Sequence, residues 1–282
     1  MILTSSTFVG LAAWTMALLV LPGSLIARIL LLAPLVIAPR LLRWRGWPAL
    51  VAALPLCIAF AVPPGPVAAA LSAPWVVLAV AALGATVRDV IPRLRGLLRP
   101  TGVPELGSAT AVGFLAVGAT FLAIDRLGLQ PMGFSPVIIL LTAVHFHFAG
   151  FGLLTVASHL ARSRAWTRLP VVGLIAGIPI TSLGFVAESL WISALGAVIV
   201  GGSGLGVGLG LLGVASGRRF DRVAWRLAGF SLLIAMPLGI AWSVALIFGA
   251  ALLPLDAMVR THGVLNALAV TLVALRDDGL AS

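Results

Sequence analysis

Long apolar runs alternate with short polar breaks along almost the whole chain. Glycine, proline and arginine mark the breaks, and most runs approach the roughly 20 apolar residues that a helix needs to cross a bilayer. Ten runs fit this pattern: 4–21, 25–42, 47–62, 67–85, 108–124, 136–160, 169–186, 190–214, 223–248 and 255–275. The first four are less sharply delimited, because Arg28 interrupts the second and only the proline-rich hairpin 63–66 separates the third from the fourth. The pattern predicts an all-α, polytopic transmembrane helix bundle of about ten spans.

Arginine occurs mainly in every second break between the runs. These residues are Arg40, Arg43 and Arg45, then Arg88, Arg93, Arg95 and Arg99, then Arg162, Arg164 and Arg168, then Arg218, Arg219, Arg222 and Arg226, and finally Arg276. Because cytoplasmic loops carry an excess of positive charge, this alternation places the N-terminus and the C-terminus in the cytoplasm. No basic residue precedes the first run, so we expect it to be a retained span and not a cleaved signal. The expected location is the cytoplasmic (inner) membrane, with the lipid bilayer as the chain's partner.

The composition leaves no room for a sizeable soluble domain. Hydrophobic residues make up 61% of the 282 and charged residues 9%, whereas soluble domains carry about 25% charged residues. We therefore expect a single integral membrane domain over 1–282. Within it, 1–100 holds four spans and a basic loop, and 105–275 holds a core of six spans.

The charged and reactive residues exclude several functions. All basic residues are arginine, and a chain without lysine cannot form a Schiff base. The formal charge of +10 lies in the breaks between runs, which indicates membrane orientation and not nucleic-acid binding. Cys57 is the lone cysteine and lies in an apolar run, which leaves no internal disulfide and no cysteine metal cluster. Motifs of catalytic serine, cysteine or lysine are absent too, which argues against covalent hydrolase chemistry.

Two histidines, His145 and His147, lie in the middle of an apolar run. Imidazoles at membrane depth are costly, so each needs a partner or a function. The expected topology places most of the other ionisable residues in or next to the spans toward the outer face of the membrane. We predict a polar pocket in the outer half, built from His145, His147, His262, Asp125, Asp256 and Asn266 and supported from behind by Arg126, Glu188 and Arg260.

Each of these residues also has a plainer interpretation. Helix positions turn by about 100° per residue, so His145 and His147 point apart; one faces the pocket and the other bonds a neighbouring helix. His262 could form a simple hydrogen bond between helices. Asp125 could form only a helix-end charge pair with Arg126. Carboxylates at helix starts are favoured by the helix dipole, which would explain Glu188 and Asp256 equally well.

The glycine-rich stretch 201–210 resembles a nucleotide-binding loop only at first sight. It lacks the lysine of a P-loop and the flanking strand and helix that such a loop needs. Gly202, Gly206 and Gly210 recur every four residues, and this spacing predicts a stripe of small residues for close helix packing.

Two segments, 125–136 (DRLGLQPMGFSP) and 142–151 (TAVHFHFAGF), together resemble the YndJ-like family of bacterial membrane proteins. A third segment, 258–267 (MVRTHGVLNA), is similar to a second His-Gly-Asn motif of that family. The resemblance covers about 105–274. It implies a multi-pass membrane protein of a family whose members are sometimes labelled transporters, and it implies no particular activity.

Three functions remain open. The first is a small-molecule or proton-coupled transporter without a cofactor, in which the histidines bind substrate or relay protons, since imidazole titrates near physiological pH. The second is an enzyme holding iron, zinc, copper or haem on His145, His147 and His262. Against it stand the lack of HxxxH or ExxH spacing, of cysteine ligands and of any tyrosine. The third is a structural partner subunit whose histidines only join helices.

Overall fold

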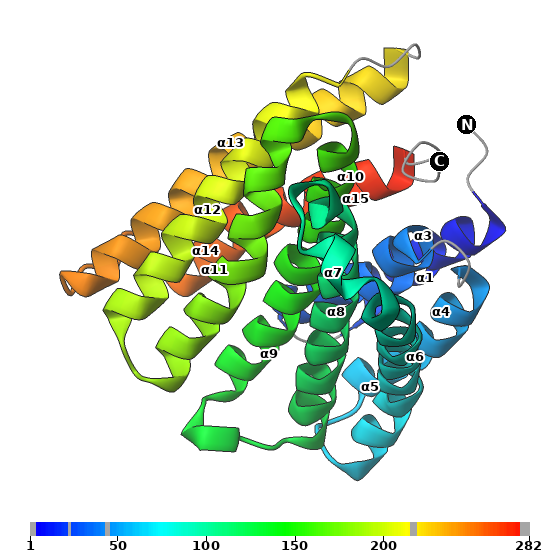
Figure 1. The fold of residues 1–282 in the computed structure, drawn as a ribbon. Helices are drawn as coiled ribbons and strands as arrows, with labels where there is room; N and C mark the ends of the chain where they lie inside the picture. Colours follow the sequence, from blue (N-terminus) through cyan, green and yellow to red (C-terminus); the bar gives the residue numbers. More distant parts are fainter. Residues whose placement is uncertain (1–3, 22–23, 43–45, 215–218, 277–282) are drawn as a thin grey trace. The chain divides into compact units, whose positions relative to one another are not determined.

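The computed structural model describes residues 4–21, 24–42, 46–214 and 219–276. Every regular element in this part of the chain is a helix, which confirms the all-α prediction (Figure 1). Seven helices of the described residues are long and apolar enough to cross a membrane: Pro66–Leu97, Pro100–Leu127, Pro136–Ser163, Ala165–Val186, Leu190–Leu212, Arg219–Ile247 and Leu255–Arg276. Their length and composition indicate a membrane protein.

The three other predicted runs form shorter helices. α1 is Ser5–Val20, and the second run is divided into α2 (Leu25–Leu32), the π-helix η1 (Ala33–Ile37) and α3 (Ala38–Leu41). The third run is divided by a proline into α4 (Gly46–Ala53) and α5 (Pro55–Ala61). At 1.5 Å per residue, 16 residues reach about 24 Å, short of a hydrocarbon core of about 30 Å. The count of ten spans therefore stays a prediction.

The remaining elements follow in chain order. They are α6 (Pro66–Val90), η3 (Ile91–Arg93), α7 (Leu94–Leu97), η4 (Pro100–Gly102), α8 (Val103–Leu127), η5 (Pro131–Gly133), α9 (Pro136–His145), η6 (Phe146–Leu153), α10 (Leu154–Ser163), η7 (Ala165–Thr167), α11 (Arg168–Val186), α12 (Leu190–Leu212), α13 (Arg219–Ile247), α14 (Leu255–Met258), η8 (Val259–Gly263) and α15 (Val264–Arg276). Arg43, Arg45 and Arg218 of the basic breaks lie outside the described residues, and the orientation of the termini stays a prediction.

Contacts group the chain into two compact units. The first contains 1–92 and 111–152, and the second contains 93–110 and 153–276. In the first unit, α1, α2, η1, α3 and α4 pack together, α4 and α5 pack against α6, and α2 packs against α9. Its core includes the fully buried side chains of Leu30, Leu35 and Leu50.

Arg28 has a clear place inside the first unit. Its guanidinium donates a hydrogen bond of 2.8 Å to the carbonyl of Leu21, which ends α1. A cation at a helix C-terminus is favoured because the last carbonyls lack partners within the helix. The Trp14 indole in turn donates to the Arg28 carbonyl at 2.9 Å. The arginine that interrupts the second run therefore holds α1 and α2 together.

Glycines bring the helices of the second unit close together. α12 packs against both α11 and α13, and α13 packs against α15 (Figure 1). A Cβ atom on Gly208 would lie 3.1 Å from the Gly229 carbonyl of α13, and one on Gly196 would lie 2.4 Å from the Thr181 nitrogen of α11. Such approaches exclude larger side chains.

The predicted glycine stripe is correct only in part. Gly206 and Gly210 do meet neighbours on α11 and on the turn before it, but a Cβ on Gly202 would have no neighbour within 4 Å. Gly201, Gly204 and Gly208 form the face that meets α13. The spacing of four residues drifts around the helix, so it does not mark a single contact face.

We expect Gly196→Ala to lower the melting temperature of the detergent-solubilised protein. The added methyl overlaps the α11 backbone, which cannot rotate away, and overpacking of this kind costs about 1–3 kcal/mol. The control is Gly202→Ala in the same helix, where the methyl has free space and alanine is the better helix former. Equal melting temperatures for the two variants would contradict the glycine-packed arrangement.

Candidate functional site

The histidine pair lies where a long helix changes its hydrogen-bonding pattern. The helix begins at Pro136, is α-helical through His145, continues as the π-helix η6 and returns to an α-helix at Leu154. Glycine fits this place because a Cβ on Gly150 would lie 2.7 Å from the side chain of Phe114 on α8. Short π-helical turns are rare and occur frequently at functional sites.

His147 is buried, with both ring nitrogens hydrogen-bonded inside the first unit. Nδ1 lies 2.8 Å from the Ala143 carbonyl, and the Trp75 indole of α6 donates to Nε2 at 3.1 Å. An indole can only donate and a carbonyl can only accept. This network therefore assigns the neutral tautomer with its proton on Nδ1. The bond to Trp75 confirms that one histidine of the pair joins a neighbouring helix.

Neighbouring residues fix the position of this ring. The Trp75 and His147 rings are stacked, with centroids 6.0 Å apart and an interplanar angle of 20°. A Cβ on Gly118 of α8 would lie 2.7 Å from Nδ1 of His147, so glycine leaves the space that the imidazole fills. A substrate or metal could reach a nitrogen of His147 only by displacing a hydrogen bond.

His145 is exposed, whereas His147 is buried. Its Nδ1 lies 2.7 Å from the Leu141 carbonyl one turn earlier, so Nδ1 donates. The structure records no hydrogen bond to Nε2 from any described residue. The two histidines thus lie in different surroundings, as their divergence predicts: His147 is buried and His145 is exposed.

Asp125 and Arg126 form a buried pair at the end of α8. Two guanidinium nitrogens of Arg126 lie 2.8 Å from the same Asp125 oxygen, and a third donates to the Ala59 carbonyl at 3.3 Å. The guanidinium carbon lies 4.3 Å from the centroid of the Phe60 ring, and the Gly65 amide donates to the Arg126 carbonyl at 2.7 Å. The two residues form the expected charge pair at the end of a helix. Arg126 also links α8 to α5 and to the hairpin before α6 by hydrogen bonds.

The second histidine motif also lies in a π-helical turn, η8, within the second unit. Nδ1 of His262 lies 2.8 Å from the Ala235 carbonyl of α13, which is the hydrogen bond between helices considered above. Again a glycine makes room, since a Cβ on Gly239 would lie 2.7 Å from the ring. Asn266 donates to the His262 carbonyl at 2.7 Å and so supports the turn from below.

The remaining predicted residues are at the surface. Asp256 and Arg260 form an ion pair of 2.7 Å one turn apart, with both side chains mostly exposed. Glu188 is exposed and has a φ of 51°, in the turn that ends α11. It lies just before the cap of α12, which is Ser189: the Ser189 hydroxyl accepts a hydrogen bond from the Ile192 amide at 3.4 Å.

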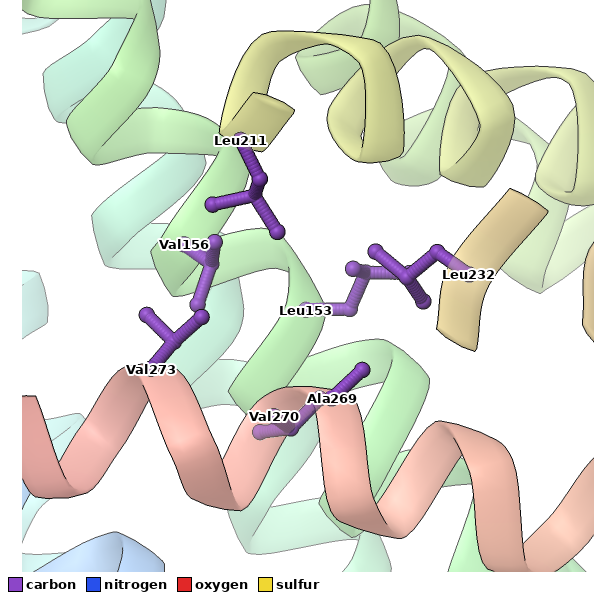
Figure 2. Close-up of a pocket in the computed structure, with 7 residues that line it drawn as sticks. All are labelled: Leu153, Val156, Leu211, Leu232, Ala269, Val270 and Val273. Carbon is purple, nitrogen blue, oxygen red and sulfur yellow. The ribbon is translucent and has the colours of Figure 1, made fainter. Parts of the chain in front are cut away.

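The structure brings together some of the predicted residues in pairs: Asp125 with Arg126, Asp256 with Arg260, and His262 with Asn266. The predicted pocket combines residues of both units, and it stays a prediction. No three histidine, cysteine or acidic side chains of the described chain lie close enough together to hold a metal ion. A shallow depression in the second unit, with no room for an enclosed water molecule, is lined only by apolar residues: Leu153, Val156, Leu211, Leu232, Ala269, Val270 and Val273 (Figure 2).

Sequence reasoning missed the partners of the histidines. Trp75 and Ala235 lie far from them along the chain, and Gly118 and Gly239 make room for the rings only once the helices are packed. A tryptophan in the middle of a span, away from the membrane surface, was the one available signal, because a buried indole needs an acceptor.

A family model described as YndJ-like protein matches residues 17–270. The chain belongs to the YndJ-like family. The match starts far before 105, so the family region includes most of the first four predicted spans as well as the three motifs. No curated protein and no solved structure matches the chain. This YndJ-like protein is therefore an all-helical member of the family, with seven helices in its described part that are long and apolar enough to cross a membrane.

We expect Trp75→Phe to destabilise this YndJ-like protein. The substitution removes the only donor that the structure gives to Nε2 of His147 within the described chain, and an unsatisfied buried acceptor costs about 1–3 kcal/mol. Thermal unfolding in detergent measures the loss, and Trp191→Phe, at an exposed tryptophan of α12, is the control. Nitrogen-15 spectra of the wild type should show His147 with its proton on Nδ1. A proton on Nε2 would contradict the assigned network.

Proposed function

We propose that this YndJ-like protein moves protons or a small solute across the cytoplasmic membrane, and that His145 is the side chain on which the transfer depends. The observation that carries the proposal is the exposed ring of His145, of which only Nδ1 has a hydrogen bond in the described chain, in a helix of membrane-spanning length. An ionisable side chain inside a span is costly, and such residues usually mark substrate or proton pathways.

The depth of His145 supports this role. It is the tenth residue of α9, so its Cα lies about 14 Å along the helix from Pro136, roughly half the thickness of a hydrocarbon core. At that depth hydrocarbon offers no hydrogen bond. A nitrogen without a partner in the described chain is therefore best accounted for by water or solute that reaches it.

The local hydrogen bonding suits reversible proton binding. With Nδ1 donating to the Leu141 carbonyl, Nε2 carries the lone pair and can accept a proton. The resulting imidazolium keeps its bond to Leu141, and Nε2 later releases the same proton. His147 cannot do this without losing its bond to Trp75, so we assign it a supporting role.

The π-helical turns at both motifs also support movement. η6 follows His145 directly, and η8 contains His262. Each turn interrupts the regular pattern of α-helical hydrogen bonds. We expect the backbone to change conformation more easily at such a turn than in an unbroken helix, and π-helical turns are frequent at functional sites. Asp125, Asp256 and Asn266 remain candidates for the same pathway.

His145→Ala is expected to lower proton flux at least tenfold in protein reconstituted into liposomes with an enclosed pH-sensitive dye. The Tm should stay close to wild type, since the one hydrogen bond that His145 forms with the described residues is within its own helix. The matched control is His159→Ala, which removes a histidine near the other end of the same long helix. A wild type without flux, or equal flux in His145→Ala, would contradict the proton-transfer form of the proposal.

A metal or haem enzyme is the second candidate, and one observation favours it. In both His145 and His262 the Nδ1 atom faces a backbone carbonyl, an arrangement common in metal-binding histidines because it orients the ring for binding through Nε2. Stoichiometric iron, zinc, copper or a Soret band that is lost in both His145→Ala and His262→Ala would establish this candidate in place of the transporter. Metal analysis and a visible spectrum of purified protein provide the measurement.

A further inference from the structure

α13 presents one continuous exposed face along its length. Phe220, Val223, Leu227, Phe230 and Ile234 are each about half exposed or more. They follow one another at steps of three and four residues, so they lie on the same side of the helix. The opposite side, including Ala228 and Leu232, is buried in the second unit. The exposed face is therefore the lipid-facing side of this candidate span.

Two arginines lie within this face at its first turns. Arg219 and Arg226 are exposed and seven residues apart, which places them on one side of the helix about 10 Å from each other. Neither forms an ion pair or hydrogen bond with any other side chain in the described ranges. The acidic residue between them, Asp221, is turned away and pairs with Arg276 at 3.6 Å. The positive charge on this face is thus not neutralised by that carboxylate.

The length of α13 places these arginines at the membrane surface. The helix has 29 residues, about 43 Å, whereas a hydrocarbon core is about 30 Å thick. From Ala228 to Ile247 the helix contains no charged residue and spans about 30 Å. The preceding turns, which contain Arg219 and Arg226, therefore extend into the headgroup layer.

We propose that this face of α13 is a binding site for an anionic phospholipid. The phosphate and any further anionic group of the headgroup lie between Arg219 and Arg226, whose guanidinium groups match phosphate oxygens in shape and charge. The acyl chains lie along Phe230 and Ile234, which continue the same face deeper into the membrane. The site rests on these side chains and not on the amides of the helix N-terminus. It is independent of the proposed transport function.

The test measures lipid binding by purified protein in detergent, using phosphatidylglycerol, phosphatidylcholine and inorganic phosphate as separate probes. Native mass spectrometry counts bound lipid, and thermal unfolding reports stabilisation. Wild type should bind phosphatidylglycerol more tightly than phosphatidylcholine. A basic residue near an anionic membrane surface contributes about 1 kcal/mol of binding free energy. Replacing one arginine should therefore weaken phosphatidylglycerol binding roughly fivefold, and replacing both should weaken it roughly 25-fold.

The main variant combines Arg219→Gln with Arg226→Gln. If this double variant does not fold, lipid binding is measured with each single variant. The matched control is Arg95→Gln with Arg99→Gln, which removes the same charge from exposed arginines in the connection before α8. Full phosphatidylglycerol binding by the double variant, an equal loss in the control, or equal binding of phosphatidylcholine would overturn the proposal. Stabilisation by inorganic phosphate alone would overturn it too. Proton flux plays no part in this readout, so failure here leaves the proposed function untouched.

Discussion

A polar atom in the hydrocarbon core must find its hydrogen-bond partner within the protein, and most of this structure follows from that constraint. The backbone meets it by forming helices. Several serine and threonine side chains in the long helices meet it in the same way, by donating to the carbonyl four residues earlier. Examples are Thr110, Thr120, Thr142, Ser158, Ser203 and Thr271. These hydroxyl groups therefore need no partner helix and give no reason to infer a polar site.

The hydrogen-bonding groups of an imidazole or a guanidinium cannot all be satisfied in this way, because each ring or guanidinium has several polar atoms and one backbone carbonyl can bind only some of them. Arg126 uses its own neighbour and a carbonyl of α5. His147 uses one carbonyl of its own helix and an indole of another. Among the described residues, His145 has only the first of these two kinds of partner. The contrast between the two histidines, and not their closeness in sequence, is what separates a structural residue from a functional candidate.

Those features that depend on a single helix could be predicted from the sequence. The apolar runs predicted the long helices because span length is set by bilayer thickness, and the helical turn predicted that His145 and His147 diverge. Features that depend on two helices could not be predicted in this way. The acceptor for Trp75 is 72 residues away, and the glycines that face α13 depend on how α12 is rotated. The backbone at Glu188 is another such case, because its left-handed conformation belongs to the turn that joins α11 to α12.

The π-helical turn η8 has a consequence for the evolution of the chain. A π-turn accommodates one residue more than the α-helix around it, as if a single residue had been inserted into a regular helix. Its loss by deletion would rotate α14 by about 100° against α15. Asp256, which precedes the turn, would then point to a different side of the helix relative to Asn266, which follows it. A one-residue gap at 259–263 in the alignment of a relative would therefore mark a change in the chemistry of this helix, even where every polar residue is retained.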